Sequence, residues 1–185
     1  GHRGARGEAP ENTLGGFQYI QNLGIRAVEF DVRQLKDDAL IIMHDDDFVR
    51  TSGQQKNLYE CSREELDAYN HAVNWSEWNK VEATPLLDQT LSLIQSFEHI
   101  EVEVKAVKTQ EEAEKIIEKY AIKNDISCFI YRLPNVFGKW SKPNYNTVIA
   151  TWCSNITTDI EIKVDKPDKE LTLAYIGAAA HASIK

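Results

Sequence analysis

Cysteine is scarce in this sequence, and it contains neither a long apolar run nor a run of basic residues. Cys61, Cys128 and Cys153 show no paired spacing, so they fit free thiols in a reducing compartment better than a disulfide framework or a zinc site. No stretch reaches the roughly 18 apolar residues that a membrane-spanning helix needs. The net charge is -8, which argues against a surface for nucleic acid or anionic membranes. An anionic substrate would therefore need a local arginine, lysine or metal ion.

Alternating helix and strand patterns are what the sequence does contain. With 185 residues, of which 42% are hydrophobic, the chain is large enough to bury one core. Helical spacing and capping residues predict helices at residues 10–23, 62–70, 86–97 and 109–122. Period-two alternation or continuous apolar runs predict strands at residues 26–32, 39–44, 99–105 and 126–132. This order predicts an α/β fold with parallel strands, in which the strand at 39–44 is buried on both faces.

Two of the predicted strands carry acidic side chains on one face. Glu29 and Asp31 are two residues apart in the first strand, so their side chains leave the same face. Glu101, Glu103 and Lys105 share one face of the third strand in the same way. Carboxylates on a shared buried face repel one another unless a cation lies between them, which favours an oxygen-liganded site for Mg²⁺ or Ca²⁺. For Glu29 and Asp31 alone, an edge strand with a solvated face is an alternative of about equal weight.

Two histidines are expected at the edge of the sheet where strands end. His44 closes the second predicted strand, and His2 and Arg3 precede the first predicted helix. In parallel α/β folds, the carboxyl ends of the strands build the active site. Two imidazoles beside a metal suit displacement at phosphorus, because one takes a proton from the nucleophile and the other gives one to the leaving oxygen. The residues therefore predict a site that hydrolyses phosphodiesters.

Four sequence blocks, in order, resemble the signature blocks of the glycerophosphodiester phosphodiesterase family: HRGARGEAPENT, VEFDV, HDDDFVRTSG and VEVK. The resemblance covers residues 1 to about 123, and the four blocks together are far more specific than any one of them. It implies a TIM-barrel-like (β/α) arrangement of parallel strands. It also implies hydrolysis of small-molecule glycerophosphodiesters to an alcohol and glycerol 3-phosphate, with a divalent metal ion, Mg²⁺ or Ca²⁺, as cofactor.

The same resemblance implies roles in proton transfer and phosphate binding. His2 and His44 would be the general acid and base, in an order that the sequence does not decide. Arg3 would hold the phosphate, and Lys105 would add positive charge nearby. Glu11 matches the glutamate of the family's Pro-Glu-Asn-Thr block and would help to order the site.

The metal ligands implied by the resemblance come from the two acidic strands. They are Glu29, Asp31 and Glu103. Glu101 is the rival for the third position, and Glu103 is preferred because it precedes Lys105 by two residues, as in the family.

A different resemblance covers residues from about 129 to 176. The stretch IYRLPNVFGKWSKPNYNTVIATWCSNITTDIEI, residues 130–162, resembles the C-terminal half of capsular nucleotide-sugar reductases, which are extended short-chain dehydrogenase/reductases. Their chemistry needs a Gly-rich turn between a strand and a helix and a Tyr-x-x-x-Lys pair, and the sequence has neither. We therefore expect a chimera, with a partial phosphodiesterase barrel over residues 1–125 and a short reductase-like α/β segment over residues 126–185.

A catalytically inactive chimera, at most metal-binding or self-associating, is the alternative to a working hydrolase, and reductase activity is a distant third. A TIM barrel usually needs about 250 residues, so a partial barrel leaves sheet edges through which copies can associate. The resemblance indicates a bacterial cytoplasmic protein, and no signal-peptide pattern is present. The sequence begins at Gly1 rather than Met, which leaves export open.

Other polar and aromatic residues carry less weight as functional candidates. Asp45, Asp46 and Asp47 fit a solvated turn. His71 and His99 match no family position and are expected at the surface. The tryptophans are expected to be packing residues, with a substrate loop as the lesser alternative for the first two: Trp75, Trp78, Trp140 and Trp152.

Overall fold

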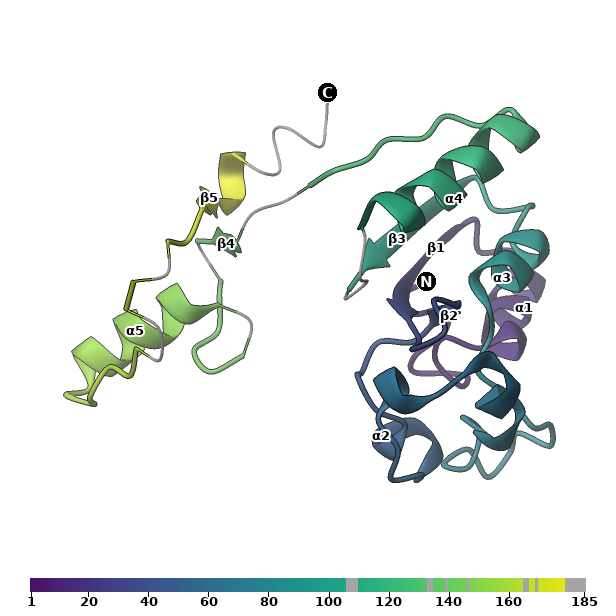
Figure 1. Ribbon diagram of the computed structural model, residues 1–185, viewed down its shortest axis with the longest axis horizontal. Coiled ribbons are helices and arrows are strands. Elements are labelled where there is room, and N and C mark those ends of the chain that lie inside the picture. The colour runs from purple at the N-terminus through teal and green to yellow at the C-terminus, as the bar shows by residue number, and fades with distance from the viewer. Residues whose placement is uncertain are drawn as a thin grey trace. The chain divides into compact units, whose positions relative to one another are not determined.

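The chain folds into two compact units, Gly1–Cys128 and Phe129–Lys185 (Figure 1). Both combine helices with parallel strands, which confirms the α/β class, and the described residues close no barrel. No helix among them is long and apolar enough to span a bilayer. The computed structural model describes residues 1–105, 110–132, 135–138, 140–145, 147–164, 167–168 and 170–178.

The first unit is built on a three-stranded sheet of order β2-β1-β3. The first and third predicted strands are confirmed as β1 (Ala27–Gln34) and β3 (His99–Val104). They pair in parallel, and their register sets Asp31 opposite Glu103. Since side chains alternate between the faces of a strand, the acidic residues of both strands lie on one side of the sheet.

The remaining strand of this sheet runs in the direction opposite to the one we predicted. β2 (Leu40–Ile42) is buried along its whole length, as its apolar run indicates, but it pairs antiparallel to β1. The connection between them is a tight turn, closed by a hydrogen bond of 2.9 Å from the Leu35 N–H to the Ala39 carbonyl. Parallel neighbours need a crossover of about a dozen residues or more, so this short turn permits only antiparallel pairing.

Three helices of the first unit pack on the face of the sheet opposite the acidic residues. The buried rings of Phe17 and Phe30 meet edge to face, with 5.7 Å between their centroids, and join a helix to β1. Val28 and Val32 extend this core along β1. The helices agree with those predicted near the same positions: α1 (Leu14–Asn22), α3 (Leu87–Leu93) and α4 (Gln110–Asn124).

A second hydrophobic cluster joins the turn before β2 and Ile41 of β2 to the segment that follows this strand. Its centre is the stacked pair of Phe48 and Tyr69, whose ring centroids are 4.0 Å apart. The predicted capped helix at 62–70 is confirmed as a 3-10 helix, with the Ser62 N–H bound to the Glu65 carboxylate at 2.9 Å. This cluster fixes the chain immediately after His44. The short helices of the segment are α2 (Val49–Ser52), η1 (Leu58–Glu60) and η2 (Arg63–Ala68).

The predicted strand at 126–132 is wrong. These residues form no regular element, and the Ile126 N–H instead binds the Ala121 carbonyl at 3.1 Å, at the end of α4. A strand needs a partner for its backbone groups, and no described strand lies against this stretch. The second unit contains β4 (Asn135–Phe137), α5 (Val148–Thr157) and β5 (Leu173–Tyr175), and its two strands pair in parallel.

Candidate active site

The N-terminal segment is held beside β1 by backbone hydrogen bonds. The Glu29 N–H donates to the Gly1 carbonyl at 2.7 Å, and the Gly4 N–H donates to the Glu29 carbonyl at 3.1 Å. These bonds bring His2 and Arg3 to the acidic side of the sheet. The Nε2 atom of His2 lies 3.7 Å from a carboxylate oxygen of Glu29.

Three carboxylates meet on this side of the sheet. One oxygen each of Glu29, Asp31 and Glu103 lie within 4.8 Å of one another, and Glu101 is not part of this group. Glu101 pairs with Glu29 in register, so it stands one pleat repeat further from Asp31 than Glu103 does. His2, Glu29 and Glu103 also line an open depression of about 460 Å³, which Glu101 and His99 line as well.

Asp31 is the most deeply buried member of the group, with 1% of its side chain exposed. Its Oδ2 atom accepts a hydrogen bond from the Asn12 side-chain amide at 2.9 Å and lies 3.4 Å from Nε of Arg3. Its Oδ1 atom has no hydrogen-bond partner, although Nζ of Lys105 is 3.3 Å away. A buried carboxylate oxygen without a hydrogen bond is costly and is well placed to ligate a cation.

Glu29 shows the electrostatic cost of this crowding. Burial raises the pKa of its carboxyl group, and the neighbouring Asp31 and Glu103 raise that pKa further, against the lowering effect of the Arg3 N–H and of His2. The three carboxylates repel one another when all are ionised, and a hard divalent cation bound between their oxygens would relieve this repulsion. Lys105 balances part of this charge, since its Nζ lies 2.5 Å from an oxygen of Glu103.

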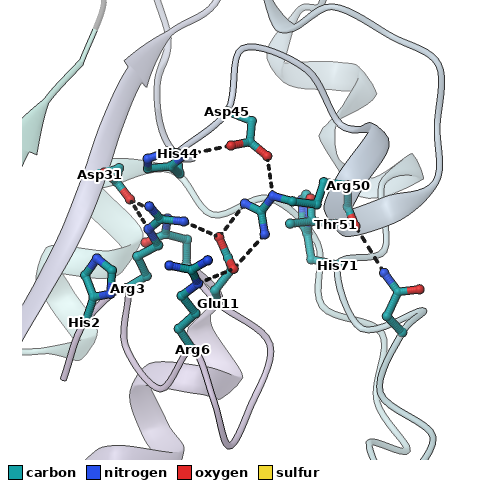
Figure 2. A network of polar contacts seen from close by, with 12 residues as sticks. His2, Arg3, Arg6, Glu11, Asp31, His44, Asp45, Arg50, Thr51 and His71 are labelled. Atoms are coloured by element: carbon teal, nitrogen blue, oxygen red, sulfur yellow. Dashed lines mark hydrogen bonds and ion pairs between the residues drawn. The ribbon is translucent and has the colours of Figure 1, made fainter. Parts of the chain in front are cut away.

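His44 follows β2 and, with Asp45 and Arg50, lines a second depression, whereas His2 and Glu29 line the first. The preceding residue, Met43, donates its N–H to the Asp31 carbonyl at 3.0 Å, which ties this segment to β1. The His44 side chain is partly exposed, and its Nδ1 lies 2.7 Å from a carboxylate oxygen of Asp45. Figure 2 shows Arg3 and Asp31 lying between His2 and His44.

Glu11 joins several basic side chains on the Arg3 side of the site. It accepts hydrogen bonds from Arg50 at 2.6 and 2.8 Å and from Arg3 at 3.2 Å, while Arg6 lies 3.6 Å away. Burial opposes ionisation of Glu11, but the hydrogen bonds and charges of Arg50 and Arg3 outweigh it and lower the pKa of its carboxyl group. Glu11 is therefore charged and holds the Arg3 guanidinium in place.

Two expectations about charged residues near the site are wrong. His71 is buried rather than on the surface, because its ring nitrogens bind the hydroxyls of Thr51 at 2.8 Å and Thr84 at 2.7 Å. Burial lowers the pKa of His71 to about 4. Asp45 does not belong to a solvated turn, since it binds both His44 and Arg50.

The expectations for the other histidine and the tryptophans have mixed outcomes. His99 is exposed, as expected. Trp78 packs against the core and donates its Nε1 proton to Glu82 at 2.9 Å, so it is a packing residue. Trp140 is 91% exposed and is not one.

Sequence reasoning missed three residues that the structure places in the site. Asn12 binds Asp31, and Arg50 and Asp45 bind each other at 2.6 Å. All three lie inside the sequence blocks that carry the family resemblance, and this location was the feature of the sequence that could have identified them as site residues. Their contacts depend on segments far apart in the chain, as the 39-residue separation of Arg50 and Glu11 shows.

Comparison with known proteins gives one family match and two kinds of relative. The profile described as "Glycerophosphoryl diester phosphodiesterase family" matches residues 2–180. A glycerophosphodiester phosphodiesterase of Bacillus altitudinis is 31% identical over 93 residues, which are 50% of this chain and 38% of that protein. A UDP-2-acetamido-2,6-beta-L-arabino-hexul-4-ose reductase of Pseudomonas aeruginosa is 51% identical over 63 residues, 33% of this chain and 17% of that protein. The two relatives agree with the two resemblances found in the sequence.

The solved structures show the fold. A glycerophosphodiester phosphodiesterase of Agrobacterium tumefaciens superposes with a TM-score of 0.61 at 24% identity, over 68% of this chain and 54% of that one. The enzyme of Thermotoga maritima superposes with a TM-score of 0.53 at 20% identity, over 86% and 69%. The fold is TIM-barrel-like, as expected, and the chain spans about half the length of the Agrobacterium structure.

Proposed function

The chain belongs to the glycerophosphoryl diester phosphodiesterase family, and on this premise we propose that it hydrolyses glycerophosphodiesters to an alcohol and glycerol 3-phosphate. The observation that carries this function is the meeting of Glu29, Asp31 and Glu103 beside His2, with the segment of His44 bound to the backbone of Asp31. An acidic group beside two imidazoles and an arginine supplies charge stabilisation and proton transfer together.

The metal would be held by Glu29, Asp31 and Glu103. Their oxygens lie within 4.8 Å of one another, and Oδ1 of Asp31 lacks a hydrogen-bond partner. All three donors are carboxylates, the ligand type that Mg²⁺ and Ca²⁺ prefer. A bound divalent ion would neutralise charge on the phosphoryl oxygens.

The two histidines would move the protons. One takes a proton from the attacking water while the water oxygen forms its bond to phosphorus. The bond from phosphorus to the alcohol oxygen breaks, and the second histidine gives that oxygen its proton. Displacement along one line needs the two histidines on opposite sides of the phosphorus atom.

Arg3 and Lys105 would supply the positive charge that the acidic chain otherwise lacks. The Arg3 guanidinium is held between Glu11 at 3.2 Å and Asp31 at 3.4 Å. Its planar fork can bind two oxygens of a phosphate at once. Lys105 adds a point charge beside Asp31 and Glu103.

Glycerol 3-phosphate release from glycerophosphocholine tests this function. The purified chain is incubated with Mg²⁺ or Ca²⁺ or with EDTA, and glycerol 3-phosphate is measured by an enzyme-coupled assay. We expect product only with metal, and none from Glu29→Gln. A wild-type chain that folds and binds metal, but releases no glycerol 3-phosphate from several headgroups, would contradict the function.

A metal-binding, self-associating domain without turnover is the second candidate. It is favoured by the open sheet, since β3 has only β1 as a neighbour among the described strands. An unpaired strand edge is a template for a second copy. Sedimentation at several concentrations, with and without metal, separates this candidate from a monomeric enzyme.

A further inference from the structure

Arg50 connects two acidic side chains that come from distant parts of the sequence. Its Nη1 and Nη2 atoms donate to the two carboxylate oxygens of Glu11 at 2.8 and 2.6 Å. Its Nε atom donates to Asp45 at 2.6 Å. Figure 2 shows the guanidinium between these two carboxylates. The two hydrogen bonds to Glu11 and the third to Asp45 use the fork of donors that an arginine offers and a lysine does not.

Each of the two carboxylates also contacts a residue that takes part in the proposed reaction. Glu11 also accepts a hydrogen bond from Arg3 at 3.2 Å. The second oxygen of Asp45 lies 2.7 Å from Nδ1 of His44. A continuous series of contacts therefore runs from Arg3 through Glu11, Arg50 and Asp45 to His44.

The backbone that carries Arg50 is itself held on both sides. The Arg50 carbonyl accepts a hydrogen bond from the Asn74 side chain at 3.1 Å. The next residue, Thr51, binds the buried His71 ring at 2.8 Å. Behind α2, Gly53 has a φ of 73°, a left-handed conformation that glycine adopts without steric cost. A guanidinium on a fixed backbone can hold its partners in one geometry.

We propose that Arg50 is a positioning residue that sets the geometry of the phosphate-binding arginine and of one catalytic histidine through its two carboxylates. Through Asp45 it keeps the proton of the neutral His44 ring on Nδ1, which leaves the lone pair of Nε2 for proton transfer. Through Glu11 it keeps the Arg3 guanidinium fixed. This inference rests on the proposed function for its purpose, but the protonated nitrogen of His44 is measurable without any turnover.

The ring nitrogens of His44 give the first readout. The full chain is labelled with ¹⁵N-histidine and measured by NMR at about pH 8, where an ordinary histidine is neutral. We expect His44 to carry its proton on Nδ1 in the wild type. In Asp45→Ala we expect at least half of the His44 population to move to the Nε2-protonated form. We expect the same in Arg50→Met, because Asp45 then loses its hydrogen bond from Arg50.

Two matched variants separate the contact from a loss of charge or fold. Arg26→Met removes an exposed arginine that pairs with Glu98 at 3.1 Å, and His44 should keep the wild-type tautomer. Arg50→Lys keeps the charge but loses the fork, and we expect an intermediate population. The ring signals of buried His71 report whether each variant is folded. If Arg50→Met does not fold, Asp45→Ala and Arg50→Lys still test whether these contacts set the tautomer of His44.

Turnover of glycerophosphocholine gives the second readout. We expect Arg50→Lys to lower kcat about tenfold or more with a smaller change in KM, because geometry rather than substrate affinity is lost. A His44 tautomer that is the same in the wild type, Asp45→Ala and Arg50→Lys would overturn the positioning role even if the wild type is active. A tautomer that shifts in a chain without turnover would overturn the proposed function and leave the link from Arg50 to His44 in place.

Discussion

Asp31 on β1 and Glu103 on β3 are register partners, and the ammonium of Lys105 lies 3.3 Å from the first and 2.5 Å from the second. This lysine neutralises part of the charge of the acidic group. Glu29 belongs to the same group, and the pKa of its carboxyl is raised chiefly by burial. The group therefore carries excess negative charge in a partly buried place. A divalent cation would remove that excess, and stability in its presence is the first quantity to measure.

Metal should raise the melting temperature of the wild type and not that of Glu29→Gln or Glu103→Gln. At a free metal concentration of about 100 times Kd, binding to the folded state adds about 2.7 kcal/mol to the free energy of unfolding. Thermal melts with EDTA and then with Mg²⁺ or Ca²⁺ measure this. Glu101→Gln is the matched control on the same face of β3 and should retain the metal response. A response lost in Glu101→Gln and kept in Glu103→Gln would assign the third ligand to Glu101.

His44→Gln should lower kcat for glycerophosphocholine by about 10²–10⁴-fold, the usual contribution of a general acid or base. Steady-state kinetics with saturating metal measures the loss. Arg26→Met is the control, because this exposed arginine pairs with Glu98 at 3.1 Å, away from the acidic group, and it should retain activity. Equal activity of the wild type and His44→Gln would remove His44 from the mechanism.

Stability should fall as pH falls from about 6.5 to about 4, because of His71. Burial lowers the folded-state pKa of this ring to about 4, below the 6.5 of an exposed histidine. Between these values the unfolded chain binds the proton first, so acidification favours unfolding, by about 3 kcal/mol once both states are protonated. Urea unfolding at a series of pH values measures the loss.

The control for this pH effect is His71→Asn, which lacks the titrating ring. It should be less stable at neutral pH, because Thr51 and Thr84 lose a hydrogen-bond partner. Its stability should also change less over the same pH interval. The same slope in both proteins would show that other groups cause the acid sensitivity.

Phe30→Ala should lower the free energy of unfolding by about 3–5 kcal/mol, since it removes a fully buried ring that packs on Phe17 across the helix–sheet interface. Chemical denaturation monitored by circular dichroism measures this. Leu23→Ala, at a 59% exposed position next to α1, should change stability by less than about 0.5 kcal/mol. Similar losses in the two variants would mean that the core does not lie where the structure has it.

The sequence predicted most of the elements of the first unit because their signals are local. Helical spacing located α1, α3 and α4, and the Ser62–Glu65 capping box located η2. The strand predicted at 126–132 failed because β-branched and aromatic residues make a strand only when another strand is available to pair with them. The direction of β2 followed from a tight turn that its apolar run does not reveal.

The candidate site divides in the same way between local and long-range information. Period-two alternation by itself determined that Glu29 and Asp31 share a face, and the family blocks supplied the histidines and Arg3. The family resemblance favoured Glu103 over Glu101, and only the tertiary structure brought Glu103 to them, because that meeting depends on the register between two strands distant in sequence. Only the tertiary structure also joined Arg50 to Glu11 and Asp45, since a hydrogen bond needs atoms within about 3 Å and residue order alone does not set such distances.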